Sequence, residues 1–396
     1  MTLTADNCLP KRSRCSYVMA ALGAWGLAVG FLVASLLLAH GGEPLDMIRP
    51  PNRGRANQSY GFDGQFFFAL AKDPSLRPQT VALLDAPVIR ARRIGFPLAA
   101  WLLSPVTGGP AYAMLVVLAL SSAATVWILQ AIAERNGSHP ALILSVPLAL
   151  PLALSMELVT CELTASALLV AAVAAERCRK PLPATILLGL ACLTKEVIAV
   201  AILSFVISAA LTRRFARAAA YATAIVPLAL WQVYLASHLG LRTEGGSLLA
   251  NLTVPCTGLL GEFGAAVAYL LAGVNAAKAS GLVMALLWTL AGAVLSLRLV
   301  IGKRTPGRVL ALGGTLLALM LARGAPAFAY DEIFNFGRQL FILPIGLIVV
   351  LFIEYRELSP RGRAALAFWL VVGTALGAAW WTQKIWVLSQ VPGVLG

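Results

Sequence analysis

The stretch from Leu182 to Leu211, LPATILLGLACLTKEVIAVAILSFVISAAL, is apolar except for two charged residues near its centre, Lys195 and Glu196. Basic residues flank it on both sides, at Arg177, Arg179 and Lys180 before it and at Arg213, Arg214 and Arg217 after it. Basic residues concentrate in the short cytoplasmic loops of membrane proteins, so both ends of the stretch are expected on the same side of a membrane. We therefore predict a helical hairpin whose tip carries Lys195 and Glu196.

The first limb of this hairpin, residues 183–194, is short for a membrane crossing. At helical rise it extends about 18 Å, whereas the hydrocarbon core of a bilayer is about 30 Å thick. A charged side chain that faces lipid costs about 2.5 to 3.5 kcal/mol or more. The tip is therefore predicted to lie below the outer surface, in a recess of the protein rather than in lipid.

The whole chain, like this stretch, is mostly apolar. Of its 396 residues, 59% are hydrophobic and only 12% are charged. A soluble domain with this composition would expose large apolar patches and aggregate, which excludes a soluble enzyme, a disulfide scaffold and a disordered chain. The fold class is therefore predicted to be all-α, in a polytopic membrane protein. The net charge of +14 is then explained by basic cytoplasmic loops rather than by nucleic-acid binding.

Apolar stretches between charged or Gly/Pro-rich breaks predict eleven transmembrane helices. They cover residues 16–39, 111–132, 140–155, 158–175, 183–194, 197–211, 219–238, 281–297, 309–323, 339–353 and 364–381. Two shorter stretches, 95–106 and 262–274, are predicted to be partial or interfacial helices. With the amino end in the cytoplasm, this layout puts the carboxyl end outside. Residues 1–396 then form a single membrane domain, with residues 40–93 as the first external loop.

This external loop contains YGFDGQFFFALAKDP, residues 60–74. The spacing of its apolar residues predicts a short helix at the membrane interface, which Pro74 ends. Asp63 stands at the start of this helix, where an aspartate is favoured as a cap and contributes about 1 kcal/mol. The neighbouring Gly64 allows close approach of another chain segment or of a substrate. A catalytic or ligand-binding role for Asp63 is therefore the competing interpretation, and it is compatible with capping.

The same segment resembles the aromatic-Asp-Gly-Gln-aromatic motif that follows the first span in bacterial members of the GT-C glycosyltransferases. Other stretches are similar to later motifs of that group: RARRIGFPLAAW at 90–101, SMELVTCE at 155–162, LTKE at 193–196, NLTVP at 251–255 with Gly258, and FGR at 336–338. The chain departs from the group at Phe67 and Phe68, where Tyr is commoner, and at Lys195, where Arg is commoner.

The resemblance implies a GT-C-like fold and a specific reaction. A sugar would pass, with inversion, from a polyprenyl-phosphate donor to a cell-envelope glycan or lipid acceptor at the periplasmic face of the bacterial inner membrane. Such a transfer needs a group that takes the acceptor's proton and cations that hold the phosphate. The resemblance gives the first role, that of the catalytic base, to Asp63. Substrate binding then falls to Gln65, Arg90, Arg92, Arg93, Glu157, Lys195, Glu196 and Arg338.

Several of these residues also have a purely structural interpretation. Arg92 and Arg93 would extend along the membrane interface. Lys195 and Glu196 would only neutralise each other at the hairpin tip. Arg338 would anchor the end of its helix.

Metal-ligand patterns are weak in this sequence. The three histidines are scattered, and Glu157 and Glu162 point about 140° apart on one helix, so they do not form a carboxylate pair. Glu162 is instead expected to pack against another helix or against Lys195. No cofactor and no structural metal are predicted, and a divalent cation that bridges Asp63 to the phosphate is left open.

The alternative function is a transporter or flippase for a polyprenyl-linked or amphipathic solute. In that case Lys195, Glu196, Glu157 and Glu162 would form the translocation path. Such proteins often carry inverted repeats and polar breaks at the membrane midplane in both halves. The unusual polar groups of this chain are instead predicted near one membrane face, which favours an enzyme.

Overall fold

The computed structural model of the chain describes residues 11–39, 41–48, 63–147, 149–239, 276–302, 305–320 and 341–389, together with residues 261, 264, 267, 268 and 271. All regular elements in this part are helical, and it contains no strand, so the predicted all-α class is confirmed there. Up to residue 177 the helices are α1 (Lys11–Ala34), η1 (Ser35–Ala39), α2 (Pro44–Ile48), α3 (Asp63–Lys72), α4 (Pro78–Val81), α5 (Pro87–Ala91), α6 (Gly95–Thr107), α7 (Pro110–Asn136), α8 (Ala141–Leu144), α9 (Leu150–Glu157) and α10 (Glu162–Arg177). Beyond it they are α11 (Pro181–Thr194), η2 (Glu196–Ile198), α12 (Ala199–Leu211), α13 (Phe215–Ala222), η3 (Thr223–Ile225), α14 (Val226–Leu239), α16 (Ala276–Gly302), α17 (Pro306–Met320), α19 (Ile342–Ile353) and α20 (Pro360–Ser389).

Four helical stretches in the described part are long and apolar enough to cross a membrane. They are Arg14–Leu38, Pro110–Asn136, Phe215–Leu239 and Pro360–Ala379. Other apolar helices are shorter, among them α6, α11 and α19. The membrane class is supported by these helices, while the count of eleven crossings stays a prediction.

The predicted span at residues 140–155 is wrong in detail, because the chain is not continuously helical there. It forms two short helices, α8 and α9, with an irregular segment between them. Pro147 lies in that segment. A proline has no backbone N–H, and it also disfavours helical geometry at the preceding residue, so a helix through this position would lose a hydrogen bond.

Helix α19 forms part of the core, and all twelve of its residues are buried. A helix that is apolar on every side must be surrounded by other helices or by lipid. It crosses α17 closely through two glycines. A Cβ at Gly346 would lie 2.6 Å from the backbone nitrogen of Ala311, and a Cβ at Gly314 would lie 2.5 Å from that of Leu343. Small residues at such crossings allow the close backbone approach that stabilises helix pairs in membranes.

The predicted hairpin is present, since the chain turns back at Lys195 between α11 and α12. The backbone of Lys195 is extended, with φ −152° and ψ 120°, which interrupts the helix. The arginines that flank the two limbs, Arg177 and Arg179 on one side and Arg214 and Arg217 on the other, line the same pocket. Both ends of the hairpin therefore lie at one end of the bundle.

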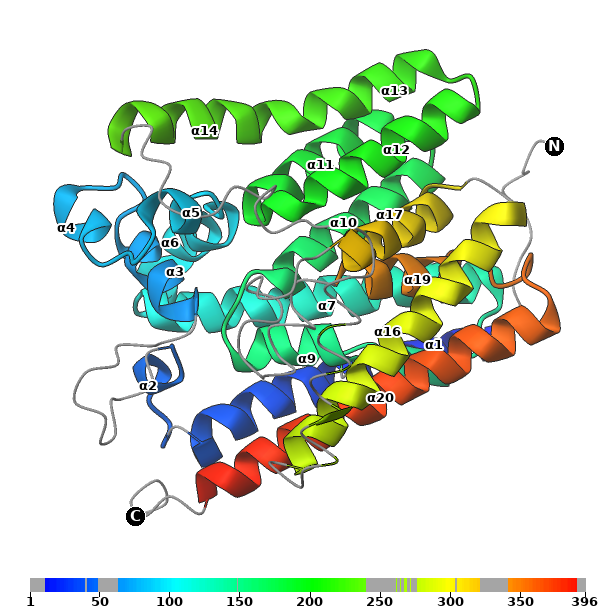
Figure 1. Cartoon of the computed structure of the whole chain (residues 1–396), viewed down its shortest axis with the longest axis horizontal. Coiled ribbons are helices and arrows are strands. Elements are labelled where there is room, and N and C mark those ends of the chain that lie inside the picture. Colours follow the sequence, from blue (N-terminus) through cyan, green and yellow to red (C-terminus); the bar gives the residue numbers. More distant parts are fainter. Residues whose placement is uncertain are drawn as a thin grey trace.

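Other basic segments gather at this same end. Arg14 of α1 contacts Glu134 of α7 at 3.2 Å, and Arg356 donates a hydrogen bond to the carbonyl of Asn136 at 3.1 Å. Figure 1 shows this end on the right, where α10, α12 and α17 meet, and the short helices α2–α6 at the opposite end on the left. The segments assigned to the cytoplasm by their charge are thus collected on one side of the described structure.

Candidate functional site

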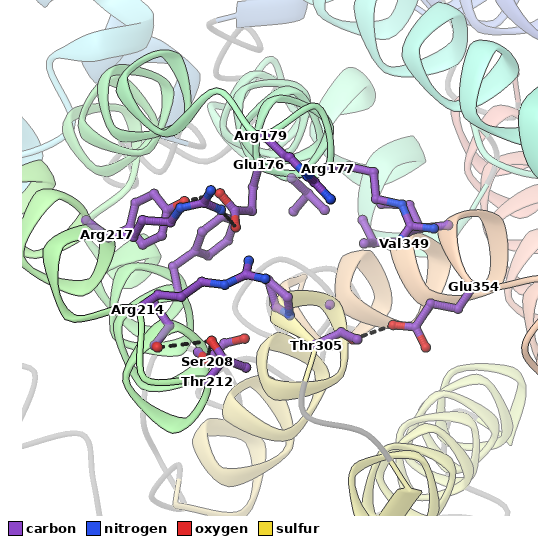
Figure 2. Close-up of a pocket in the computed structure, with 17 residues that line it drawn as sticks. Glu176, Arg177, Arg179, Ser208, Thr212, Arg214, Arg217, Thr305, Val349 and Glu354 are labelled. Atoms are coloured by element: carbon purple, nitrogen blue, oxygen red, sulfur yellow. Dashed lines mark hydrogen bonds and ion pairs between the residues drawn. The ribbon is translucent and has the colours of Figure 1, made fainter. Parts of the chain in front are cut away.

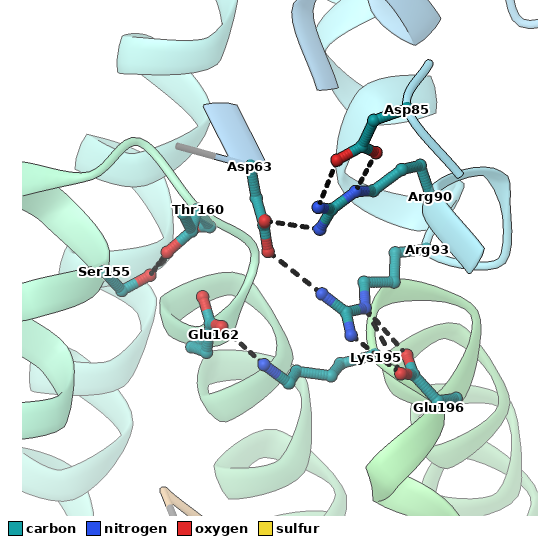
Figure 3. Close-up of polar contacts among 9 residues, drawn as sticks. All are labelled: Asp63, Asp85, Arg90, Arg93, Ser155, Thr160, Glu162, Lys195 and Glu196. Carbon is teal, nitrogen blue, oxygen red and sulfur yellow. Dashed lines mark hydrogen bonds and ion pairs between the residues drawn. The ribbon is translucent and has the colours of Figure 1, made fainter. Parts of the chain in front are cut away.

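Asp63 lies at the start of α3 and forms ion pairs with two arginines. Its Oδ1 accepts a hydrogen bond from Nη1 of Arg90 at 2.6 Å, and its Oδ2 accepts one from Nη1 of Arg93 at 3.0 Å. Figure 3 shows the carboxylate directed at both guanidinium groups. The exposed fractions of the side chains are 14% for Asp63, 22% for Arg90 and 9% for Arg93. The carboxylate is therefore held in place yet still reachable from solvent.

Two glycines allow the backbone segments around Asp63 to come this close. A Cβ at Gly64 would lie 3.0 Å from the carbonyl oxygen of Leu158, in the turn between α9 and α10. A Cβ at Gly95, the first residue of α6, would lie 2.8 Å from the backbone nitrogen of Thr194. The close approach that the sequence predicts at Gly64 is therefore present, and the group that approaches is another segment of the chain.

The apolar side of α3 packs on α6 and α7. Phe66, Phe67 and Leu70 are buried, and the ring of Phe67 meets that of Phe96 edge-on at 5.7 Å. The predicted helix is present, but its apolar residues contact protein, which fixes the direction in which Asp63 points.

Arg90 lies on α5 and is held in place by further contacts. Its Nε and Nη2 donate to the two oxygens of Asp85 at 2.8 and 3.0 Å, and its guanidinium lies 4.4 Å from the centre of the Phe66 ring. Trp231 of α14 donates a hydrogen bond to the carbonyl of Ala91 at 2.7 Å, which ties α5 to the long helix beside it. The partner Asp85 was not predicted from the sequence. Its only signal is its position two residues before the proline that starts α5.

The two charged residues at the hairpin tip have different partners. Glu196 accepts from Nε and Nη2 of Arg93 at 3.0 and 2.9 Å, whereas Lys195 pairs with Glu162 of α10. The interpretation that Lys195 and Glu196 neutralise each other is therefore wrong. Consecutive side chains of an extended backbone point to opposite sides, and the extended conformation at Lys195 separates the two charges in this way.

Lys195 and Glu162 are fully buried, with no exposed side-chain surface. The Nζ of Lys195 also lies 5.6 Å from the centre of the Phe341 ring. Glu162 stands at the first position of α10, where the helix dipole favours a negative charge. The turn before it is fixed by Ser155, whose hydroxyl donates to the carbonyl of Thr160 and accepts from the backbone of Leu163, both at 2.9 Å. The expected contact between Glu162 and Lys195 is confirmed.

The carboxylates around the arginines keep them charged. Burial alone would lower the pKa of Arg93, but its contacts with Glu196 and Asp63 outweigh this effect and raise the pKa well above its ordinary value. The pKa of Arg90 is raised as well, because the contacts with Asp85 and Asp63 again exceed the effect of burial. Both guanidinium groups are therefore permanent cations in this site.

An apolar groove of about 830 Å³ is lined by residues that lie close in sequence to Arg93 and Lys195. Its wall includes Ile94, which follows Arg93, and Leu193, which lies two residues before Lys195. It is also lined by Leu98, Trp101, Leu230, Trp231 and Tyr234, with the charged residues Lys72, Asp73 and Arg77 in the lining as well. Trp101 and Leu230 are 45% and 66% exposed, so the groove opens to the outside of the bundle.

The remaining predicted site residues are less closely connected to Asp63. Gln65 lies about 200° around α3 from it. Arg92 has no acidic partner among the described residues, and its buried Nε has no hydrogen-bond partner there. Glu157 is the last residue of α9, and the prediction for its side chain falls outside what the structure describes. Arg338 and the segment 251–258 also lie outside the described residues.

Within the described residues, no group of three or more His, Cys, Asp or Glu side chains could hold a metal ion. At Asp63 both carboxylate oxygens already face guanidinium groups. These two positive charges would repel a divalent cation at this position.

No protein-family model, curated protein or solved structure matches the chain. A functional interpretation therefore depends on the geometry of this site.

Proposed function

We propose that the protein is a membrane glycosyltransferase that moves a sugar from a polyprenyl-phosphate donor to a cell-envelope or lipid-linked acceptor. The observation that supports it best is the placing of one reachable carboxylate, Asp63, against two arginines, with an apolar groove nearby that is lined by Ile94, the residue after Arg93. A lipid-linked phosphate sugar needs all three features: a base, cations for the phosphate and a surface for the apolar chain.

In the proposed reaction, Asp63 is the general base. The acceptor hydroxyl oxygen attacks the anomeric carbon while its proton passes to the Asp63 carboxylate. The bond between the anomeric carbon and the phosphate oxygen breaks, and polyprenyl phosphate leaves with the electron pair. Attack from the face opposite the leaving group inverts the anomeric configuration.

Arg90 and Arg93 would stabilise the charge that develops on the phosphate. Each guanidinium has five N–H donors, and three of them bond to the described carboxylates. The other two on each arginine can bind phosphate oxygens without breaking the ion pairs. Asp85 and Glu196 then act as positioning residues, because they hold the arginines in this orientation.

The groove beside the arginines suits the apolar chain of the donor. Its walls are largely aromatic and aliphatic, and exposed Trp101 and Leu230 would face the lipid. If the polyprenyl chain of the donor lay along this groove, the phosphate of the donor would come close to Ile94 and thus to Arg93. We propose that the active site receives its donor from the membrane, at the periplasmic face of the bacterial inner membrane.

The test is to incubate membranes that contain the protein with a panel of radiolabelled polyprenyl-phosphate sugars and a cell-envelope extract as acceptor. The proposal expects one sugar label to leave its carrier, and the same label to stay on its carrier in membranes without the protein. If instead the intact labelled donor changes leaflet and keeps its sugar, the transporter alternative is correct. If no label moves with any donor, the proposed reaction is wrong.

A further inference from the structure

A second polar site lies at the other end of α11, away from Asp63. It is a pocket of about 380 Å³ between α10, α12, α13, α17 and α19. Four arginines line it: Arg177, Arg179, Arg214 and Arg217. We call it the arginine pocket. Figure 2 shows these side chains coming from the two sides of the hairpin base, with Arg214 reaching toward the middle of the space.

The acids that line the pocket are already engaged by other groups. Glu176 contacts Arg217 at 3.3 Å and accepts a hydrogen bond from Tyr221. Glu354 pairs at 2.6 Å with Arg308, which lies outside the pocket, and it also accepts a hydrogen bond from Thr305. The arginine pocket therefore holds an excess of positive charge.

Three of the four arginines carry this excess. No described acid lies within ion-pair distance of Arg177, Arg179 or Arg214. They come from the end of α10, from the turn that follows it and from the residue before α13. Like charges from separate segments repel one another, so a concave arrangement of this kind is stabilised by an anion that binds between them.

The other lining groups indicate what kind of anion would fit. Helix α17 begins at the pocket, so its positive dipole end adds to the field of the arginines. Phe205 and Val349 supply apolar surface. Guanidinium groups bind phosphate through paired N–H donors.

We propose that the arginine pocket binds a phosphate-bearing anion at the face of the protein opposite the Asp63 site. The phosphate would belong either to the headgroup of an anionic membrane lipid or to a soluble phosphate compound. This inference is independent of the glycosyltransferase proposal, because it uses none of the residues of that site.

The experiment measures the thermal unfolding of the purified protein in nanodiscs. The two probes are phosphatidylglycerol, mixed into phosphatidylcholine nanodiscs, and pyrophosphate, added to nanodiscs of phosphatidylcholine alone. The proposal expects at least one probe to raise the unfolding midpoint by about 2 °C or more. Stabilisation by phosphatidylglycerol alone identifies a lipid headgroup, and stabilisation by pyrophosphate identifies a soluble phosphate as a ligand.

The test variant combines Arg177→Gln, Arg179→Gln and Arg214→Gln. The matched control combines Arg135→Gln, Arg298→Gln and Arg361→Gln, which removes the same charge from exposed arginines outside the pocket. Stabilisation should be lost in the test variant and kept in the control. The single Arg214→Gln variant should weaken binding about tenfold, which keeps the test decisive if the triple variant does not fold. The proposal is overturned if neither probe stabilises the wild-type protein, or if the pocket variants respond as the control does.

Discussion

Lys195 and Glu162 form an ion pair that has no exposed side-chain surface. Removing one partner of such a pair leaves a buried charge without compensation, which costs about 3–5 kcal/mol. We therefore expect Lys195→Met to lower the free energy of unfolding by about that amount. The double variant Lys195→Met with Glu162→Met should recover most of it, because both charges are gone. Denaturant unfolding in detergent micelles, analysed as a double-mutant cycle, checks this; equal losses in the single and double variants would show that the pairing does not determine stability.

Arg93 connects Asp63 to Glu196 through three of its N–H groups. A lysine keeps the charge but cannot make these contacts at once. We expect Arg93→Lys to lower kcat/KM for the lipid donor at least about tenfold, the effect of losing one charged hydrogen bond. Arg135→Lys, far from the site, serves as the control. An unchanged kcat/KM in Arg93→Lys would mean that the simultaneous contacts of the Arg93 guanidinium group are not needed for the reaction.

The sequence could indicate several members of the ion-paired cluster around Asp63 but not all of their partners. Asp63, Arg90 and Arg93 were predicted as site residues, and the structure brings them into contact. Asp85 was missed, and the pairing of Glu196 with Arg93 was not predicted. Partner choice depends on the direction of each side chain, and the extended backbone at Lys195 that sets two of these directions is not visible in a hydropathy pattern.

At the scale of elements, the junction of α3, α6 and α11 determines where Asp63 sits. Gly95 allows α6 to start directly against Thr194, the last residue of α11. A Cβ there would clash with backbone, which cannot move as a side chain can. We expect Gly95→Ala to destabilise the protein by about 1–3 kcal/mol and to reduce activity by displacing Arg93.

Gly26→Ala is the matched control for this prediction, because a Cβ at Gly26 would meet no atom within 4 Å. Thermal unfolding and transfer rates of the two variants should be measured together. If Gly95→Ala behaves like Gly26→Ala, the close contact between α6 and α11 is not important for the site.

The elements themselves could largely be predicted from apolar periodicity. A short helix with Asp63 at its start and Pro74 at its end was predicted, as was the reversal at Lys195. The structure has both, with the helix at Asp63–Lys72. The failure at 140–155 has a local cause, since hydropathy counts a proline-containing stretch as apolar whether or not a helix can continue through it. The close crossings at Gly64 and Gly95 required knowledge of the neighbouring segment, which one sequence does not contain.

For the whole molecule, we expect the Asp63 site and the arginine pocket to open to opposite sides of the membrane. Ser75 lies in the exposed turn after α3, and Cys178 lies in the exposed turn after α10. In intact cells a membrane-impermeant maleimide should modify Ser75→Cys in a variant without the native cysteines. Cys178, kept as the single cysteine, should react only after the membrane is permeabilised. Labelling of both positions from the outside would contradict the predicted topology.

The membrane class follows from composition alone, but the number of crossings does not. Helices such as α11 and α19 are too short to span about 30 Å of hydrocarbon, and α19 is buried on all sides. The burial of α19 is compatible with a half-spanning helix that contacts protein, and hydropathy cannot distinguish such a helix from a full crossing. The segregation of basic segments to one end is the part of the topology that the described structure supports.

The central claim is that the Asp63 carboxylate takes the proton of the sugar acceptor. The most direct measurement is the rate at which label leaves the polyprenyl-phosphate donor in Asp63→Asn, with Glu43→Gln as a control at an exposed acid outside the site. Asparagine keeps the shape but cannot accept the proton, so the rate should fall about 10²–10⁴-fold. The variant should still be folded, as shown by an unchanged elution volume in size-exclusion chromatography and a cooperative melting transition. A folded Asp63→Asn variant that transfers sugar within about tenfold of the wild-type rate would contradict the claim, because general-base catalysis contributes more than that.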